Sequence, residues 1–304
     1  MAEDPQAELQ ELLREVRRIE FQSLRLVTSV MAGGYTSVFR GAGLEFDGVR
    51  EFSEGDDPRA IDWNVTARVG RHHVKKFVDE RELTVVFLVD LSASMHGGYA
   101  GWSARQTAAR FCACLALAAV RNHDKVGLVA FSARVDRYVP PQKGLGHALR
   151  IVRDCLALPA GAATTDLAAP LERVTRVLRR RSIVFLVSDF LADGWQRAAG
   201  LCARRHDLIA VRLLAPELTP AASGLARVRD PETGAQRLVD WSDARCRDHY
   251  AAQVAAWDAR TSAALRRADV DCLDVRIPRT PAYEAIARPI LDFFRMREVR
   301  SARS

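Results

Sequence analysis

Several features that mark large classes of proteins are missing from this sequence. No apolar stretch approaches the roughly 20 residues that a helix needs to cross a bilayer, and the longest candidate, Phe111 to Val120, has the length of a buried helix. The first residues, Met-Ala-Glu-Asp-Pro-Gln, provide neither the basic nor the apolar region of a signal peptide. We therefore expect no membrane span and a cytoplasmic location.

Sites built on cysteine or histidine are also missing, as are two common catalytic patterns. The six cysteines include no C-x-x-C pair, and no His/Cys cluster has zinc-binding spacing, which argues against a structural zinc site and a redox motif. The sequence has no Ser/His/Asp ordering and no phosphate-binding loop of the form G-x-x-x-x-G-K. We expect the cysteines to be buried free thiols.

The chain is basic, with 45 Lys and Arg residues against 38 Asp and Glu residues. Its densest basic block, Arg179-Arg180-Arg181, closes a predicted helix, where cations complement the helix dipole. No stacking aromatic residues are interleaved with this block. The pattern favours a solvated helix end, and we expect no nucleic-acid partner.

The most informative segment is an apolar run that ends in oxygen-bearing side chains. Residues 85–89 are β-branched, aromatic or aliphatic, which is typical of a strand buried on both faces. Asp90, Ser92 and Ser94 follow, at the end of the strand where α/β sheets bind ligands. Their oxygens are hard ligands of the kind that magnesium prefers. The segment predicts a metal site, although Ser and Asp also satisfy backbone amides in ordinary turns.

Two later segments strengthen the metal hypothesis. Residues 182–190 form a second apolar strand that ends in a carboxylate, and residues 161–171 form a small-residue loop containing Thr-Asp-Leu. The order Asp-x-Ser-x-Ser, Thr-Asp-Leu and strand-end Asp resembles the metal-ion-dependent adhesion site of von Willebrand factor A domains. Carried over by position, the resemblance implies that Mg²⁺ or Mn²⁺ is held by Asp90, Ser92, Ser94, Thr165 and Asp189.

From residue 81 onwards, predicted strands and helices alternate, as in parallel βαβ units. We expect an α/β fold over residues 81–215, with a doubly wound, mostly parallel sheet like that of von Willebrand factor A domains, ending at residue 214. Residues 216–304 are expected to supply a hairpin around residues 230–234 and C-terminal helices that pack on the same body. These are a helix over 242–267 and another from Tyr283, interrupted near Pro289.

Residues 1–80 predict an N-terminal helical and β-rich extension. Apolar residues at helical spacing indicate a helix over 7–31, and a glycine-bounded β-rich region follows from 36 to 52. Residues 55–68 predict a further helix, with Asp57 as its N-cap and Pro58 at its first position.

The most specific motif of the chain is the string Gly55-Asp56-Asp57-Pro58-Arg59-Ala60-Ile61-Asp62-Trp63. This string resembles the bacterial family catalogued as domain of unknown function 58. Val49-Arg50-Glu51-Phe52 and Asp124-Lys125-Val126-Gly127-Leu128 agree, and the match runs from about residue 10 to 295. The resemblance implies a von Willebrand factor A-like domain, usually encoded near an AAA-type ATPase of the MoxR class, that works as an adaptor or chaperone-type component. Two segments depart from the pattern: Leu214-Ala215-Pro216-Glu217 replaces an Asp-Pro-Arg-Glu stretch, and Ser188-Asp189-Phe190 replaces Thr-Asp-Gly.

We therefore expect a non-enzymatic protein that binds a partner through its metal. Neutral hydroxyl ligands leave the cation able to accept a carboxylate from a partner protein, with a MoxR-type ATPase or its client as the partner that the resemblance implies. A magnesium-dependent phosphohydrolase is the first alternative, although such an enzyme usually needs a second acid two positions after the first, where Ser92 stands. A structural scaffold with a vestigial metal site is the second.

The Gly-Asp-Asp-Pro-Arg motif has two interpretations. Its polar residues could simply cap a helix and form local ion pairs. Alternatively, they contact a partner, because the motif devotes much polar surface to a short segment. The candidate contact residues are Asp56, Asp57, Arg59, Asp62 and Trp63.

Overall fold

The computed structural model describes residues 10, 13–24, 45–53, 56–78, 82–98, 100–159 and 164–301. Contacts divide the chain into two units. The small unit comprises residues 39–82, and the large unit comprises residues 1–38 and 83–304. The N-terminal extension expected over residues 1–80 therefore contributes to both units, whereas the segments expected over 81–215 and 216–304 lie almost entirely in one.

A six-stranded sheet forms the centre of the large unit. Its strand order is β10-β7-β6-β3-β4-β5, and every neighbouring pair is parallel except β4 with β5. This confirms the mostly parallel α/β sheet. The expected end of the sheet at residue 214 is wrong, because one more parallel strand pairs with β7. The strands are β3 (Thr84–Asp90), β4 (Lys125–Phe131), β5 (Val135–Gln142), β6 (Ile183–Ser188), β7 (Asp207–Leu214) and β10 (Asp271–Arg276).

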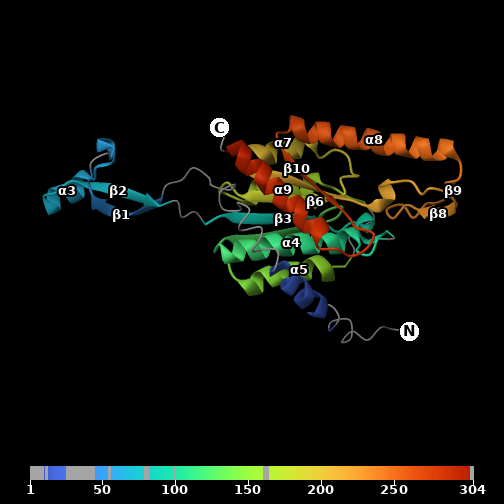
Figure 1. Ribbon diagram of the computed structural model, residues 1–304, viewed down its shortest axis with the longest axis horizontal. Helices are drawn as coiled ribbons and strands as arrows, with labels where there is room; N and C mark the ends of the chain where they lie inside the picture. The colour runs from blue at the N-terminus through green and yellow to red at the C-terminus, as the bar shows by residue number, and fades with distance from the viewer. Residues whose placement is uncertain are drawn as a thin grey trace. The chain divides into compact units, whose positions relative to one another are not determined.

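Helices cover both faces of this sheet, so the doubly wound arrangement is also confirmed (Figure 1). On one face α4 (Ala104–Arg121) packs against α5 (Leu145–Ala157) and α9 (Glu284–Ser301). On the other face α7 (Gln196–Arg205) packs against α6 (Ala168–Val177) and α8 (Ala244–Arg267).

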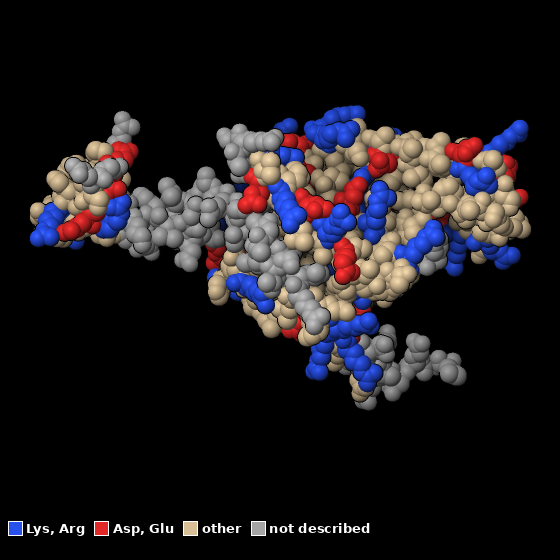
Figure 2. Space-filling model, in the orientation of Figure 1, with Lys and Arg blue, Asp and Glu red and all other residues tan. Residues whose placement is uncertain are grey.

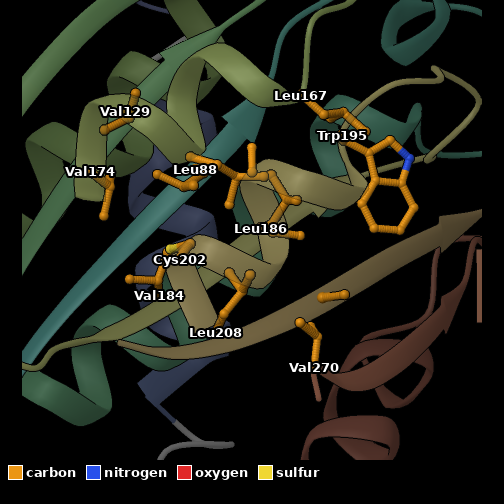
Figure 3. Packing of buried hydrophobic residues seen from close by; sticks show 14 of the residues in the cluster. Leu88, Val129, Leu167, Val174, Val184, Leu186, Trp195, Cys202, Leu208 and Val270 are labelled. Atoms are coloured by element: carbon orange, nitrogen blue, oxygen red, sulfur yellow. The ribbon is translucent and has the colours of Figure 1, made fainter. Parts of the chain in front are cut away.

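Two apolar cores result from the alternation of side chains along the strands. Val86 and Leu88 of β3 join Val184 and Leu186 of β6 in the core beneath α6 and α7, where Trp195 also lies (Figure 3). Neighbouring positions point to the opposite face. There Phe87 stacks on Phe185, with 5.7 Å between ring centroids, and Phe111 of α4 packs edge-on to Phe185.

Helix α4 is buried nearly all round, as its apolar surface predicts. The described part of the expected N-terminal helix, residues 13–24, is helical and covers α4 from outside the sheet. Ile19 packs against Ala113 and Val152, and the Cys114 thiol donates to the Ser23 hydroxyl. Four cysteines are buried as expected, but Cys246 is half-buried and Cys272 is exposed.

The C-terminal part of the large unit adds a hairpin and two helices. Strands β8 (Leu225–Arg229) and β9 (Gln236–Asp240) pair antiparallel and confirm the predicted hairpin. Helix α9 runs through Pro289 without the expected interruption, because the buried side chains of Ile286, Ile290 and Phe294 hold it against the body. On the outer surface of the large unit around α9, basic and acidic side chains lie next to one another (Figure 2).

The small unit is a two-stranded sheet with a short helix. Strands β1 (Glu45–Glu51) and β2 (His73–Val78) pair antiparallel, and α3 (Trp63–Val69) lies between them in sequence. The expected helix over 55–68 is wrong in its start. Pro58–Ala60 form only a 3-10 turn, since Ile61 bridges to Val74 and interrupts the helix. The N-cap is therefore Asp62 and not Asp57.

Candidate metal centre

The two predicted acidic ligands, Asp90 and Asp189, lie at the ends of two adjacent strands. β3 and β6 are parallel neighbours, and Val89 pairs with Val187 in their register. Asp90 is therefore the last residue of β3, and Asp189 follows the last residue of β6 at the same edge of the sheet. Each carboxylate lies where a buried strand opens into a loop, which is where α/β proteins bind ligands.

Hydrogen bonds connect four of the five predicted ligands. The Ser94 hydroxyl donates to Asp189 Oδ2 over 2.7 Å, and the Ser92 and Ser94 hydroxyl oxygens lie 3.1 Å apart. The Ser92 backbone N–H donates to Asp90 Oδ1 over 2.9 Å. The Asp-x-Ser-x-Ser loop and the loop after β6 thus meet in one cluster of oxygen atoms.

The surroundings of Asp90 strongly shift the pKa of its carboxyl group. Its side chain is fully buried, and burial together with the nearby charge of Asp189 raises the pKa of Asp90 to about 7. Hydrogen bonds from Ser188 and Ser92 act in the opposite direction. A cation at this position would relieve both unfavourable effects, since it would compensate the buried charge and the repulsion between the carboxylates.

The fifth predicted ligand, Thr165, is not hydrogen-bonded to the other four within the described part of the chain. Its hydroxyl donates instead to Glu232 Oε1 over 2.8 Å. The loop that carries it is nevertheless tied to the edge of the sheet, because the Asp166 N–H donates to the Ser132 carbonyl just beyond β4. Asp166 itself accepts bonds from the N–H groups of Ala168 and Ala169 at the start of α6.

Ser188 contacts the candidate ligand Asp90, although no sequence pattern predicts this contact. Its hydroxyl donates to Asp90 Oδ2 over 2.7 Å and accepts a bond from the Phe190 N–H over 3.1 Å. The side chain is fully buried. Its place as the last residue of an apolar strand was the available signal, because a hydroxyl there needs a buried partner.

The loop after Asp189 has a backbone conformation that favours glycine. Phe190 has a φ of 59°, in the left-handed region, although it stands where adhesion-type domains commonly have Gly. Its ring is buried and packs edge-on to Trp195 at 5.4 Å, and its carbonyl accepts a bond from the Trp257 ring N–H. Packing of the ring therefore offsets the backbone strain next to Asp189.

The chemistry of the five predicted ligands indicates which kind of cation they suit. Three are the hydroxyls of Ser92, Ser94 and Thr165, and two are the carboxylates of Asp90 and Asp189. The described residues contain no group of three or more His, Cys, Asp or Glu side chains with metal-binding geometry. The donors are mainly hydroxyls, so they fit a hard cation such as Mg²⁺ or Mn²⁺ better than a soft one.

Two acidic residues of the Gly-Asp-Asp-Pro-Arg segment and its helix, Asp56 and Asp62, make hydrogen bonds within the small unit. Asp56 accepts two bonds from Arg50, at 2.7 and 2.6 Å, and one from the Ser53 N–H. Asp62 caps α3 by accepting from the N–H groups of Asn64 and Val65. Trp63, in contrast, is 66% exposed. The side chain of Arg59 lies outside the described part, and the partner-contact role of the motif stays a prediction.

Comparison with known sequences identifies the family. A family model described as "Protein of unknown function DUF58" matches residues 48–260. The chain belongs to the DUF58 family. The uncharacterized protein Rv1480 of Mycobacterium tuberculosis is 30% identical over 273 residues, covering 88% of this DUF58 chain and 86% of its own length. The uncharacterized protein MAV169 of Mycobacterium avium is 30% identical over 145 residues, covering 46% of this chain and 85% of its own.

Solved structures similar to this DUF58 chain share little sequence with it. The conserved hypothetical protein BatB from Bacteroides thetaiotaomicron is 17% identical, with a TM-score of 0.42, and the match covers 73% of this chain and all of BatB. Proximal thread matrix protein 1 from the mussel byssus, with a zinc-occupied MIDAS motif, is 18% identical, with a TM-score of 0.34, covering 44% of this chain and 38% of its own. Among the described helices of the DUF58 chain, none combines the length and apolarity needed to cross a membrane.

Proposed function

We propose that this DUF58 protein is a non-enzymatic adaptor that binds a partner protein through a divalent cation, Mg²⁺ or Mn²⁺. The observation that carries the proposal is the cluster in which Ser94 links Ser92 to Asp189, beside the buried Asp90. These residues and Thr165 would hold the cation. When bound, the cation supplies attraction for a carboxylate.

The donor set favours ligation over chemistry. Hydroxyl ligands carry no charge, so a cation held by Ser92, Ser94 and Thr165 keeps more affinity for an incoming Asp or Glu than one in an all-carboxylate cage would. A phosphohydrolase would use a second acid two residues after Asp90, and Ser92 occupies that position. Its hydroxyl bonds to Ser94, as expected for one member of a ligand set.

The family resemblance suggests the partner. We propose a MoxR-type AAA ATPase, or a client of that ATPase, as the protein that supplies the carboxylate. Assembly or maturation of other proteins is then the process in which the complex takes part.

A pull-down with the purified MoxR-type ATPase of the same organism tests this proposal. We expect recovery of the ATPase with magnesium, and loss of recovery with chelator or with the Ser92→Ala/Ser94→Ala double variant. Circular dichroism should show that the variant stays folded, because both serines lie in the loop after β3 and not in the apolar cores. Equal recovery under all three conditions would contradict metal-bridged binding.

A further inference from the structure

Helices α7 and α8 line a groove with a volume of about 400 Å³. Three arginines contribute to its lining: Arg197 and Arg204 from α7, and Arg267 from the last turn of α8. Most of the remaining lining is small or apolar and includes Leu201 and Ala264. The Leu201 side chain is 47% exposed, which is unusual for a leucine that could be covered by a neighbouring helix. The groove therefore combines open apolar surface with three cations.

Helical spacing explains why α7 presents these residues together. Arg197, Leu201 and Arg204 are four and three residues apart, so they lie on one face of the helix. A rise of 1.5 Å per residue puts the two arginine positions about 10 Å apart along the axis, with Leu201 between them. The buried residues of α7, such as Ala198 and Cys202, lie on the opposite side and pack in the apolar core. The face that lines the groove is therefore free of core packing.

The positive charge of the groove is not compensated by the chain. Within the residues that the structure describes, Arg197, Arg204 and Arg267 make no ion pair and no hydrogen bond. Residues 196–205 and 260–267 together carry six arginines and no Asp or Glu. Elsewhere in the large unit, buried arginines bond to carboxylates at distances of 2.6–2.7 Å. The groove thus lacks the acidic partners that the chain supplies to other arginines.

The helix dipoles account for two of these cations but not for the third. Arg204 and Arg267 lie in the last turns of their helices, where positive charge is favourable. Arg197 is the second residue of α7, and a cation there is unfavourable because the helix begins with the positive end of its dipole. The first turn of α7 holds no acidic residue that would offset this effect. A residue that opposes a local rule in this way is typical of a binding surface.

We propose that this groove docks an acidic segment of a partner protein, in which an apolar side chain lies between carboxylates. The carboxylates would pair with Arg197 and Arg204, whose planar guanidinium groups suit two-point bonding to Asp or Glu. The apolar side chain would cover Leu201. An extended chain rises about 3.3 Å per residue, so acids about three positions apart match the 10 Å between the two arginine positions. This docking needs no cation and is independent of the proposed metal site.

The lining favours an acidic peptide over a nucleic acid. The lining residues that the structure describes include no aromatic ring on which a base could stack. The exposed Leu201 offers instead a contact for an aliphatic side chain. We therefore expect charge and apolar contact to contribute together, so that neither a polyanion without apolar groups nor an uncharged peptide binds well.

Fluorescence anisotropy tests the proposal, with the full chain, chelator in the buffer and a labelled peptide of sequence Ser-Asp-Glu-Leu-Glu-Asp-Ser. Chelator keeps the metal site from contributing. We expect Arg197→Ala/Arg204→Ala to weaken peptide binding about tenfold through loss of two ion pairs. The matched control, Arg227→Ala/Arg237→Ala, removes two exposed arginines from the β8–β9 hairpin and should bind as the wild type does. Circular dichroism checks that each variant is folded.

The apolar contact is tested separately. Replacing the leucine of the peptide with serine should weaken binding about tenfold, and so should Leu201→Ser in the protein. Binding of an oligothymidylate that survives Leu201→Ser, with no binding of the peptide to the wild type, would show a general polyanion surface and overturn the proposal. Equal weakening by the two double variants would also overturn it, because the peptide would then respond only to net charge.

Discussion

The Ser94 hydroxyl donates a 2.7 Å hydrogen bond to Asp189, a residue 95 positions later in the chain. This contact joins the loop after β3 to the loop after β6. It forms because the two strands are parallel neighbours, so their carboxyl ends lie at one edge of the sheet. The metal site proposed for this protein depends on that juxtaposition and on the residues that support it.

The Ser188 hydroxyl bonds to Asp90, and removing it should lower both the stability of the fold and the affinity for metal. In Ser188→Ala, Asp90 loses a hydrogen bond and the buried Phe190 N–H loses its acceptor. We expect a loss of about 1–3 kcal/mol in the free energy of unfolding and about 10–100-fold weaker manganese binding. Urea unfolding and calorimetric titration measure the two effects.

The control for this variant is Ser182→Ala, which removes a hydroxyl bonded to the Arg180 carbonyl just before the same strand. It should leave manganese affinity unchanged. Equal loss of affinity in both variants would mean that Ser188 affects the site only through general stability.

The buried carboxyl of Asp90 makes the stability of the metal-free protein depend on pH. Its pKa is raised from 3.8 to about 7 on folding, so the folded protein binds more protons than the unfolded chain between these values. The contribution of Asp90 to stability is therefore greatest at low pH and is lost as the pH rises from about 4 to about 7, by up to about 1.4 kcal/mol per unit. Unfolding of wild type and Asp90→Asn in chelator, compared across that range, isolates this group. A stability difference that is constant with pH would contradict the raised pKa.

Phe190 combines backbone strain with a buried ring, and two substitutions separate these effects. Phe190→Ala and Phe190→Gly both lose the packing against Trp195, which should cost about 3 kcal/mol or more. Only glycine also relieves the left-handed φ of 59°. We therefore expect the glycine variant to be about 1 kcal/mol more stable than the alanine variant in urea unfolding. The reverse order would show that the loop does not hold this conformation.

We expect the chain to have no catalytic turnover of its own. A cation bound at the site would engage both carboxylates of the predicted ligand set, Asp90 and Asp189, and would leave neither free to act as a general acid or base. A screen against phosphate esters, peptides and nucleotides with magnesium measures this. Hydrolysis that needs the metal and disappears in Asp90→Asn would instead support the phosphohydrolase alternative.

Local patterns predicted much of this molecule because the decisive features are short-range. The buried strands carry uninterrupted apolar runs, and Asp90 and Asp189 stand at their ends, so the central strands and the location of both carboxylates at one edge of the sheet follow from the sequence. Strand β10 escaped prediction because it lies at the edge of the sheet and alternates buried and exposed residues, as Asp271–Arg276 show. Asp57 does not cap α3 because Ile61 pairs with Val74, a tertiary contact that has no local sequence signal.

The contacts of Ser188 and Glu232 are also tertiary. In the sequence, Ser188 looks like one more residue of an apolar strand. Its contact with Asp90 forms only when β3 and β6 pair in the folded chain. Glu232 belongs to a hairpin that was predicted, but its approach to Thr165 depends on how the hairpin is anchored to α8. Sequence patterns indicate strands and hairpins, but the contacts that these elements make with distant segments form only in the folded chain.

Calorimetric titration of manganese into the wild type and Asp90→Ala is the most direct test of the proposed metal site. We expect one site in the wild type and none in the variant, with both proteins folded by circular dichroism. Identical heats for the two proteins would contradict it, because Asp90 is the buried carboxylate around which the site is built.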